Sequence, residues 1–551
     1  MDKTLNDRLF AAVYNSDPAG ITALIREGAD VNARGFGNYT VLGLAIEKNN
    51  ADVVNELLLQ GAKPDNMPGS NDLLNAIKKR NKGCIAGLIR AGADVNSEDS
   101  DHNTALILAA EKGDPDELNE LIQAKADMNF VNRDGNTALI IAIYRGQMDM
   151  AGILLKAGAD ADIKGSGGRT ALIIAAESGN TGMLKQLLKA GAGVNARDND
   201  GNSPMILATA RGDADAVNEL IKAKADPDIM GFGNYTALIL SVENGYTKIT
   251  RSLLDVNAKL NTENNDGETA LIAGIKKGYA EICRMLIKAG AHVNGYDLHG
   301  NSPVMLALDR KYYEIAKTLL DAGSSPEAKD SKKNTALIRA AESGDTAATE
   351  MMIRSGSDLN ARGFGAYTAL CHAARQNHAE IAELLISSGA DVNVKGYGRY
   401  TALHFAAENN CVQIAIKLMD SGADINAKDL FGLTPLMTAS KKGNLFLVKE
   451  LLAKGSEPNE KDNNLNTPLI LAAESGNDFV VIELINKGAF INVVNKDGDT
   501  ALMASVKEGK VTAAKRLLSA GADMNIANNM GHIAKDEANE ELKSLFSENQ
   551  R

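Results

Sequence analysis

One cluster of residues in the sequence has side chains that could bind a metal ion. It consists of Cys371, His372, His404 and Cys411. Zinc prefers thiolate and imidazole ligands, but a structural zinc site needs four ligands that lie close together. Cys371 and His404 stand 33 residues apart at equivalent positions of a repeating pattern, where a helical core residue is expected. We therefore predict a structural role for the cluster and no bound metal.

Glycine-rich segments at residues 35–37 and 165–168 could instead hold an anion. A glycine-rich turn that leads into a helix can bind phosphate through its backbone N–H groups. Neither segment follows a hydrophobic strand, and neither is followed by the Gly-Lys-Ser/Thr of a nucleotide-binding loop. We predict no catalytic residues and no cofactor.

Four glycine-rich segments also carry two aromatic rings each, at residues 35–39, 231–235, 363–367 and 396–400. Eight aromatic residues lie there, in a chain with only 11 Phe, 12 Tyr and no Trp: Phe36, Tyr39, Phe232, Tyr235, Phe364, Tyr367, Tyr397 and Tyr400. Two rings on one loop cannot both enter a helical core, so we expect exposed ring surface. The rings are then anchors for a partner, or a ladder in which each ring folds onto the next loop.

These loops recur because the whole sequence is periodic. A Thr-Ala-Leu-like triplet returns every 33 residues, with its first residue at Thr104, Thr137, Thr170, Ser203, Thr236, Thr269, Ser302, Thr335, Thr368, Thr401, Thr434, Thr467, Thr500 and a degenerate Ile533. Steps of 32, 32 and 33 residues extend the register back to Asp72, Thr40 and Asp7. The pattern predicts about seventeen repeats, each with a capped first helix, a second helix and a terminating glycine such as Gly158.

The repeats resemble those of the ankyrin-repeat family. One repeat shows the resemblance in Thr104-Ala105-Leu106, Ala109-Ala110, Gly113 and Asn129. The resemblance implies an all-α solenoid of stacked helix-turn-helix repeats with hairpin tips, whose concave face binds proteins. We expect a single solenoid over residues 1–551, with a capping repeat at 1–36, internal repeats at 37–528 that are irregular at 64–103, and a truncated cap at 529–551.

The residues seven positions after each cap are mostly charged, and acidic and non-acidic residues alternate with one slip, at Asp309 beside Glu342. Glu342, Arg375, Glu408 and Lys441 are four consecutive members of this row. The row predicts either ion pairs that hold neighbouring repeats in register or a groove that selects a partner of mixed charge. Lys125, Lys224 and Asn257 replace the terminating glycine, which predicts weaker joints there.

Composition limits the partners. The formal net charge is −12, from 59 Lys and Arg against 71 Asp and Glu, and no basic block stands out. We therefore expect no nucleic-acid partner and no membrane insertion. The four cysteines show no paired spacing and no signal-peptide core is evident, so we expect a cytoplasmic, non-catalytic scaffold for a protein partner, with a monomer favoured. The alternatives are a small-ligand or glycan binder and an exported bacterial effector.

Overall fold

The computed structural model describes residues 3–67 and 71–548. Contacts divide the chain into two compact parts, Met1–Ala273 and Gly274–Arg551, which we call the N-terminal and C-terminal parts. The boundary falls within α17 (Ala270–Lys277). The expected continuity of one solenoid over 1–551 stays a prediction.

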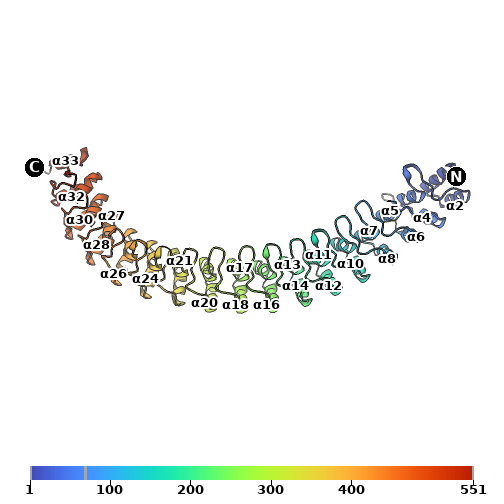
Figure 1. Ribbon diagram of the computed structural model, residues 1–551, viewed down its shortest axis with the longest axis horizontal. Coiled ribbons are helices and arrows are strands. Elements are labelled where there is room, and N and C mark those ends of the chain that lie inside the picture. The colour runs from blue at the N-terminus through green and yellow to red at the C-terminus, as the bar shows by residue number, and fades with distance from the viewer. Residues whose placement is uncertain (1–2, 68–70, 549–551) are drawn as a thin grey trace. The chain divides into compact units, whose positions relative to one another are not determined.

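Helix pairs make up each part, and the described residues contain no β-strand (Figure 1). The N-terminal part has α1 (Lys3–Tyr14), α2 (Pro18–Arg26), α3 (Val41–Glu47), α4 (Ala51–Leu59), α5 (Asp72–Lys79), α6 (Ile85–Arg90), α7 (Ala105–Lys112), α8 (Pro115–Gln123), α9 (Ala138–Tyr144), α10 (Met148–Lys156), α11 (Ala171–Ser178), α12 (Thr181–Lys189), α13 (Pro204–Arg211), α14 (Ala214–Lys222), α15 (Ala237–Glu243) and α16 (Thr247–Asp255). The C-terminal part has α18 (Ala280–Lys288), α19 (Pro303–Asp309), α20 (Tyr313–Asp321), α21 (Ala336–Ser343), α22 (Thr346–Arg354), α23 (Ala369–Arg375), α24 (Ala379–Ser387), α25 (Ala402–Glu408), α26 (Val412–Asp420), α27 (Pro435–Lys442), α28 (Leu445–Ala453), α29 (Pro468–Ser475), α30 (Asp478–Asn486), α31 (Ala501–Lys507), α32 (Val511–Ser519) and α33 (Glu540–Glu548).

The cap residues begin the first helices as the sequence predicts. The Thr104 hydroxyl accepts a hydrogen bond from the backbone N–H of Ile107 at 3.4 Å, and Thr335 does the same for Ile338 at 3.4 Å. Each bond satisfies one N–H that the helix leaves without an internal partner. Glycines follow the second helices in the left-handed conformation, with φ of 92° at Gly158 and 96° at Gly389. The predicted all-α stack of repeats is confirmed.

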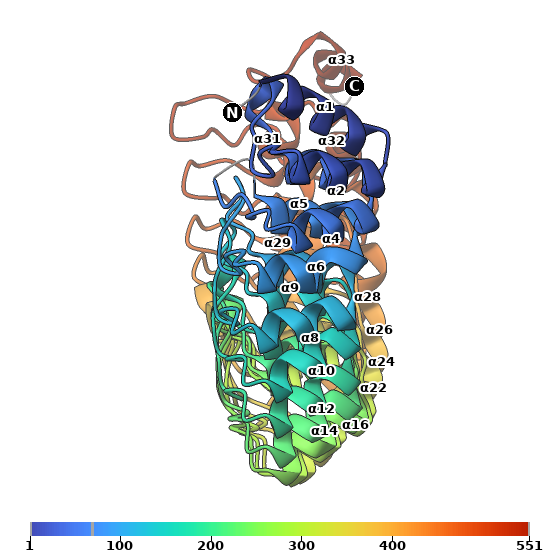
Figure 2. The ribbon, with the colours of Figure 1, turned by 90° about the vertical axis from the view of Figure 1, so that its right-hand side faces the viewer.

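Neighbouring repeats share one core. Ala109, Ala110, Leu118 and Leu121 are fully buried in the fourth repeat. First helices pack on first helices, as α7 does on α9 and α29 on α31, and second helices pack on second helices. In the N-terminal part, Figure 2 shows the second helices α8, α10, α12 and α14 in one row, with the loops projecting on the other side. No repeat buries its apolar face alone, so each depends on its neighbours.

The third repeat departs from the predicted register. Asn71, not Asp72, caps α5, and its side chain accepts a hydrogen bond from the Leu74 N–H at 2.9 Å. The Asp72 carboxylate is instead buried and accepts the Asp65 N–H at 2.8 Å. Burial raises the pKa of Asp72 to about 7. The backward step to Asp72 was therefore wrong by one residue, because either residue type can cap a helix.

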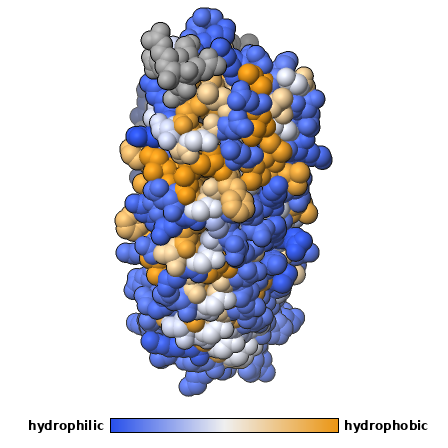
Figure 3. All heavy atoms as spheres, turned by 90° about the vertical axis from the view of Figure 1, so that its left-hand side faces the viewer, coloured by the Kyte–Doolittle hydropathy of each residue, from blue (hydrophilic) through white to orange (hydrophobic). Residues whose placement is uncertain are grey.

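The seventeenth repeat, in which Ile533 replaces the cap residue, is shorter than the others. The seventeenth repeat contributes only α33, whose Leu542 and Leu545 are buried. Figure 3, seen from the side on which the C-terminus lies, shows hydrophobic side chains gathered among hydrophilic ones. Exposed apolar residues in this part of the chain include Phe446, Phe479 and Phe490.

Three residues that replace a terminating glycine adopt the conformation that glycine favours. The φ angles are 62° at Lys125, 62° at Lys224 and 58° at Asn257. A lysine in this region is strained, because its Cβ approaches the backbone carbonyl oxygen. The predicted weak joints therefore have a local cause in the backbone.

Replacing Lys224 with Gly should raise the free energy of unfolding by about 1 kcal/mol, because it removes the left-handed strain. Urea unfolding of the full chain measures it, together with hydrogen exchange around residues 224–257. Gly191→Lys is the matched control: Gly191 ends α12 with a φ of 88°, and a Cβ there would meet no atom within 4 Å. That variant should lose about as much stability. Equal stability of both variants and the wild type would contradict the argument.

Candidate functional site

The aromatic loops have a backbone that requires glycine at two positions. In the loop at residues 363–367, a Cβ on Gly363 would collide with the Asn334 side chain, whose Oδ1 accepts the Phe364 N–H at 2.9 Å. Gly365 and Ala366 follow with positive φ of 67° and 59°. The two successive left-handed residues reverse the chain sharply and present the aromatic residues on either side of the turn.

The two rings of each loop have different environments. The first rings are exposed, by 76% at Phe232, 69% at Phe364 and 77% at Tyr397. The second rings at Tyr235, Tyr367 and Tyr400 are half-buried. At residues 35–39, Tyr39 is exposed by 51%, and the side chain of Phe36 lies outside what the structure describes.

Tyr367 shows what the second ring does. Its hydroxyl donates to the Tyr397 carbonyl oxygen at 3.1 Å, and its ring occupies the space where a Cβ on Gly396 would stand. The ladder interpretation therefore describes this second ring, whereas the first rings are free to meet a partner. A recognition role for the exposed rings stays a prediction.

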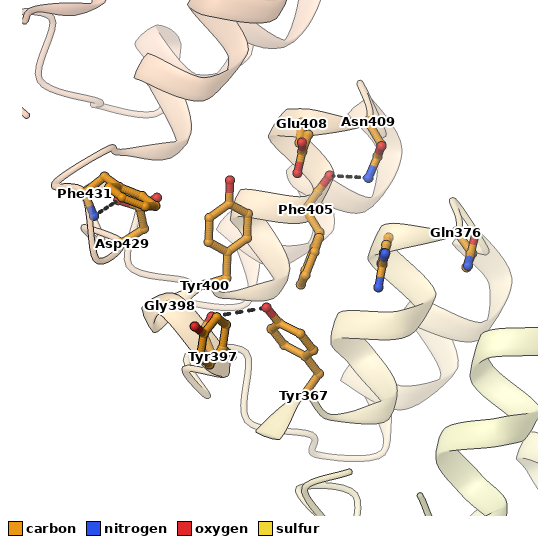
Figure 4. A pocket seen from close by; sticks show the side chains of 11 residues that line it. Tyr367, Gln376, Tyr397, Gly398, Tyr400, Phe405, Glu408, Asn409, Asp429 and Phe431 are labelled. Carbon is orange, nitrogen blue, oxygen red and sulfur yellow. Dashed lines mark hydrogen bonds between the residues drawn. The ribbon is translucent and has the colours of Figure 1, made fainter. Parts of the chain in front are cut away.

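A pocket of about 600 Å³ opens in the C-terminal part, between the loops and first helices of the twelfth to fourteenth repeats (Figure 4). Its lining residues are Tyr367, Arg375, Gln376, Tyr397, Gly398, Tyr400, Phe405, Glu408, Asn409, Asp429 and Phe431. Phe405 forms the floor: its ring centroid lies 5.1 Å from that of Tyr367 and 5.2 Å from that of Tyr400, both edge to face. Such pairs hold ring orientations fixed, so the aromatic wall is preformed.

Charged groups border these rings. The Arg375 guanidinium lies 5.9 Å from the Phe405 ring centroid. Glu408 forms an ion pair with Lys442 at 3.5 Å, and Asp429 Oδ1 accepts the backbone N–H of Phe431 at 2.8 Å. Burial, followed by the charges of Glu408 and Asp429, raises the pKa of Tyr400 to about 12. The Tyr400 phenol is therefore neutral at physiological pH and remains a hydrogen-bond donor.

The residues seven positions after each cap do not form a continuous series of ion pairs between neighbouring repeats, as one of the two interpretations of this row predicted. Glu47 and Lys79 pair directly at 2.7 Å, but Glu342 lies 3.6 Å from the imidazole of His372, whose pKa is lowered by burial. Arg375 has no ion pair within 4.0 Å among the described residues and lies against a ring instead. Position in the repeat alone does not select the ion-pair partner.

The pocket brings together only some of the predicted site residues. These are Tyr367, Tyr397, Tyr400, Arg375 and Glu408. Phe364, Glu342 and Lys441 belong to the same part of the chain but do not line the pocket, and Tyr39, Phe232 and Tyr235 belong to the N-terminal part.

Sequence reasoning missed Phe405, Asp429 and Phe431. A signal existed for two of them. Phe405 stands four residues after its cap, where aliphatic residues such as Leu108 and Ile174 stand in other repeats. Phe431 follows a leucine inside an otherwise polar Asp-x-x-Gly tip.

The Cys and His cluster is part of the core. His404 is fully buried; its Nδ1 accepts from the Thr401 N–H at 3.3 Å, and its Nε2 donates to the Leu433 carbonyl oxygen at 3.1 Å. Those two bonds assign the neutral tautomer. Cys371 and Cys411 are buried free thiols. Within the described residues, no group of three or more His, Cys, Asp or Glu side chains could hold a metal ion.

The fold defines a class of protein: a stack of two-helix repeats in which first helices pack on first helices and second helices on second helices. The family model described as Ankyrin repeats (3 copies) matches at residues 9–99, 73–165, 158–231, 206–297, 238–330, 337–429 and 430–528. The chain belongs to the ankyrin-repeat family. Ankyrin repeats are generally scaffolds for protein–protein interaction, and the family is generally non-catalytic.

No curated protein matches this chain. Within the described residues, no helix is both long and apolar enough to cross a membrane.

The buried histidines predict a loss of stability in mild acid. Burial lowers the pKa of His404 below its ordinary value of 6.5, and burial likewise lowers that of His372. Below about pH 6.5 each of these histidines takes up a proton more readily in the unfolded chain than in the folded chain, so its contribution to the free energy of unfolding falls as the pH falls. His404→Gln keeps a donor and an acceptor, and should reduce the loss between pH 7 and 5.5 by about 1 kcal/mol. Urea unfolding at both pH values measures the difference; exposed His102→Gln is the control, and an unchanged loss in H404Q would contradict this account.

Proposed function

We propose that this protein is a non-catalytic scaffold that binds a protein partner, with the pocket of the twelfth to fourteenth repeats at the centre of the interface. One observation supports this most directly: Tyr397 and Phe431 are exposed by 77% and 68% at the rim of a pocket whose inner rings are packed. Exposed aromatic surface on a rigid support is typical of interaction sites. The proposal includes a cytoplasmic location, which four buried free thiols support.

A small-ligand or glycan binder is the second candidate. The pocket volume of about 600 Å³ is within the range of small-molecule sites, and its wall combines rings with a few polar groups. One feature favours a protein partner instead. Tyr397 and Phe431 lie on the tips of two neighbouring repeats and are largely exposed, whereas the inner rings of the pocket are packed.

The first step of a test is to identify the partner. A photo-crosslinking residue at position 397 of the full chain captures proteins from the source cell lysate, and one at position 446 on α28 serves as the reference. A protein that is captured at position 397 only is then purified, and its dissociation constant is measured.

Tyr397→Ala with Phe431→Ala should weaken binding of that partner by about 30-fold or more, because a buried interface anchor contributes about 2 kcal/mol. The free energy of unfolding should change by only about 0.5 kcal/mol for each exposed ring. Phe446→Ala with Phe479→Ala is the matched control, since these rings are exposed by 65% and 62% on second helices. It should leave the affinity unchanged. Tyr367→Ala should instead lower stability, because that ring packs on the next loop.

Unchanged affinity of the Tyr397 and Phe431 double variant would contradict the proposed interface. Tight saturable binding of a glycan or small metabolite, lost in the same variant, would support the second candidate.

A further inference from the structure

Two positions of neighbouring repeats meet beside the pocket. One is in the last turn of a first helix, seven positions after its cap, and the other is the tip residue that stands five positions before the next cap. Lys78 and Asp99 occupy these positions and form an ion pair at 2.9 Å. Among the described residues, both positions are acidic in three places: Glu177 with Asp198, Asp309 with Asp330, and Glu408 with Asp429.

An arginine of the chain compensates the first two acidic pairs. Arg339 forms ion pairs with both Asp309 and Asp330, the second at 3.6 Å. Arg169 forms an ion pair with Glu177 at 3.3 Å. The pKa of Arg169 is raised first by a hydrogen bond with Tyr144 and then by the charges of Glu177 and Asp198. In both places a guanidinium therefore neutralises carboxylates that would otherwise repel each other.

The third pair has no such arginine. Arg169 stands one residue before its cap and Arg339 four residues after its cap; the equivalent residues beside Glu408 and Asp429 are Tyr400 and Thr438. Lys442 pairs with Glu408 from the exposed edge of α27. Asp429 has no ion pair within 4.0 Å among the described residues.

Asp429 also has an oxygen without a hydrogen-bond partner. Its Oδ1 accepts two backbone N–H groups, from Phe431 and Leu433, each at 2.8 Å. In other tips the second oxygen accepts the amide of an asparagine four residues later, as Asp462 does from Asn466 at 3.1 Å. Leu433 takes that place here and has no amide. Oδ2 of Asp429 is therefore unpaired among the described residues, in a side chain that lines the pocket and is only 3% exposed as a residue.

The rest of the lining suits a planar cation. Figure 4 shows the Tyr400 ring between Asp429 and Glu408, with Phe431 on the neighbouring tip. A guanidinium stacks on aromatic faces and donates several hydrogen bonds to carboxylates in its plane, which a compact ammonium does less well. Arg375 already lies against Phe405 in the same pocket, and Lys442 pairs with Glu408 from outside it, so Asp429 is the lining carboxylate without an ion pair among the described residues.

We propose that the pocket binds an arginine side chain of the protein partner, with its guanidinium held by Glu408 and Asp429 against the Tyr400 ring. This inference rests on the proposed protein-binding function and names the side chain that the interface recognises. The partner's arginine takes the place that Arg339 takes within the chain three repeats earlier.

The test uses short peptides and the full chain, so it needs no identified partner. The probes are acetyl-Gly-Arg-Gly-amide, its citrulline analogue, which is neutral and of the same shape, and its lysine analogue. Saturation-transfer NMR titrations measure their dissociation constants. We expect the arginine peptide to bind at least tenfold more tightly than the citrulline peptide and more tightly than the lysine peptide.

Variants locate the binding. Asp429→Asn and Glu408→Gln should each weaken binding of the arginine peptide at least fivefold. Asp462→Asn is the matched control in the next repeat, where the second oxygen has its asparagine partner, and should leave binding unchanged. Thr438→Arg places an internal guanidinium where Arg339 stands in its repeat, and should abolish peptide binding. Circular dichroism checks that each variant is folded. If the other variants do not fold, Glu408→Gln alone is used to locate the binding site.

Equal binding of the arginine and citrulline peptides, no binding of either, or binding unaffected by Glu408→Gln would each overturn the proposal. Tighter binding of the lysine peptide than of the arginine peptide would show that the pocket prefers an ammonium group, and this result would also overturn the proposal. If the partner's affinity depends on Tyr397 and Phe431 while the arginine peptide fails to bind, only this inference falls. If the arginine peptide binds as expected but the partner's affinity does not depend on Tyr397 and Phe431, the proposed interface is wrong instead.

Discussion

The hydrogen bond between each cap hydroxyl and the third N–H of its first helix is the interaction on which the rest of the structure depends. It starts the first helix at the same residue in the regular repeats, as at Thr104 and Thr335. Because the start is fixed, the core alanines and leucines fall on the face shared with the next repeat, and loop residues recur at fixed offsets. Without a common start, neighbouring repeats could not share a core that none of them completes alone.

Regularity of this kind makes departures informative. Around the pocket, two departures occur together: Tyr367 stands where Asn334 binds the next tip in its own repeat, and Leu433 stands where several other tips have an asparagine. Each removes a bond that the chain makes to itself elsewhere. Their combined effect is a preformed aromatic surface with carboxylates that the chain leaves partly uncompensated.

The sequence predicts the helices and their stacking because the signals for them are local. Cap hydroxyls, paired alanines and terminating glycines each act within a few residues. The cap of the third repeat was predicted one residue too late because Asn71 and Asp72 are both residue types that cap helices well. Only the burial of Asp72 in the folded structure decides between them.

The site was less predictable because its geometry arises between repeats. The sequence identified the aromatic loops but not that the first ring of a loop faces solvent while the second, such as Tyr367, packs on the next loop. It identified the charged row but not the partners, since Glu342 meets His372 and Glu408 meets Lys442. Asp429 and Phe431 line the pocket because the fourteenth repeat packs against the thirteenth, and this contact between repeats is not visible in the sequence.

The pocket draws its walls from three consecutive repeats: Tyr367 from the twelfth, Tyr400 and Phe405 from the thirteenth, and Asp429 from the fourteenth. Arrays of this type change length in evolution by gaining or losing whole repeats, and nearest-neighbour packing makes such changes easy to accommodate. An unequal crossover outside this triplet would alter the length of the protein and keep the pocket intact. One inside it would leave a well-folded array whose pocket is divided, so selection on binding would preserve the order of these three repeats as a block.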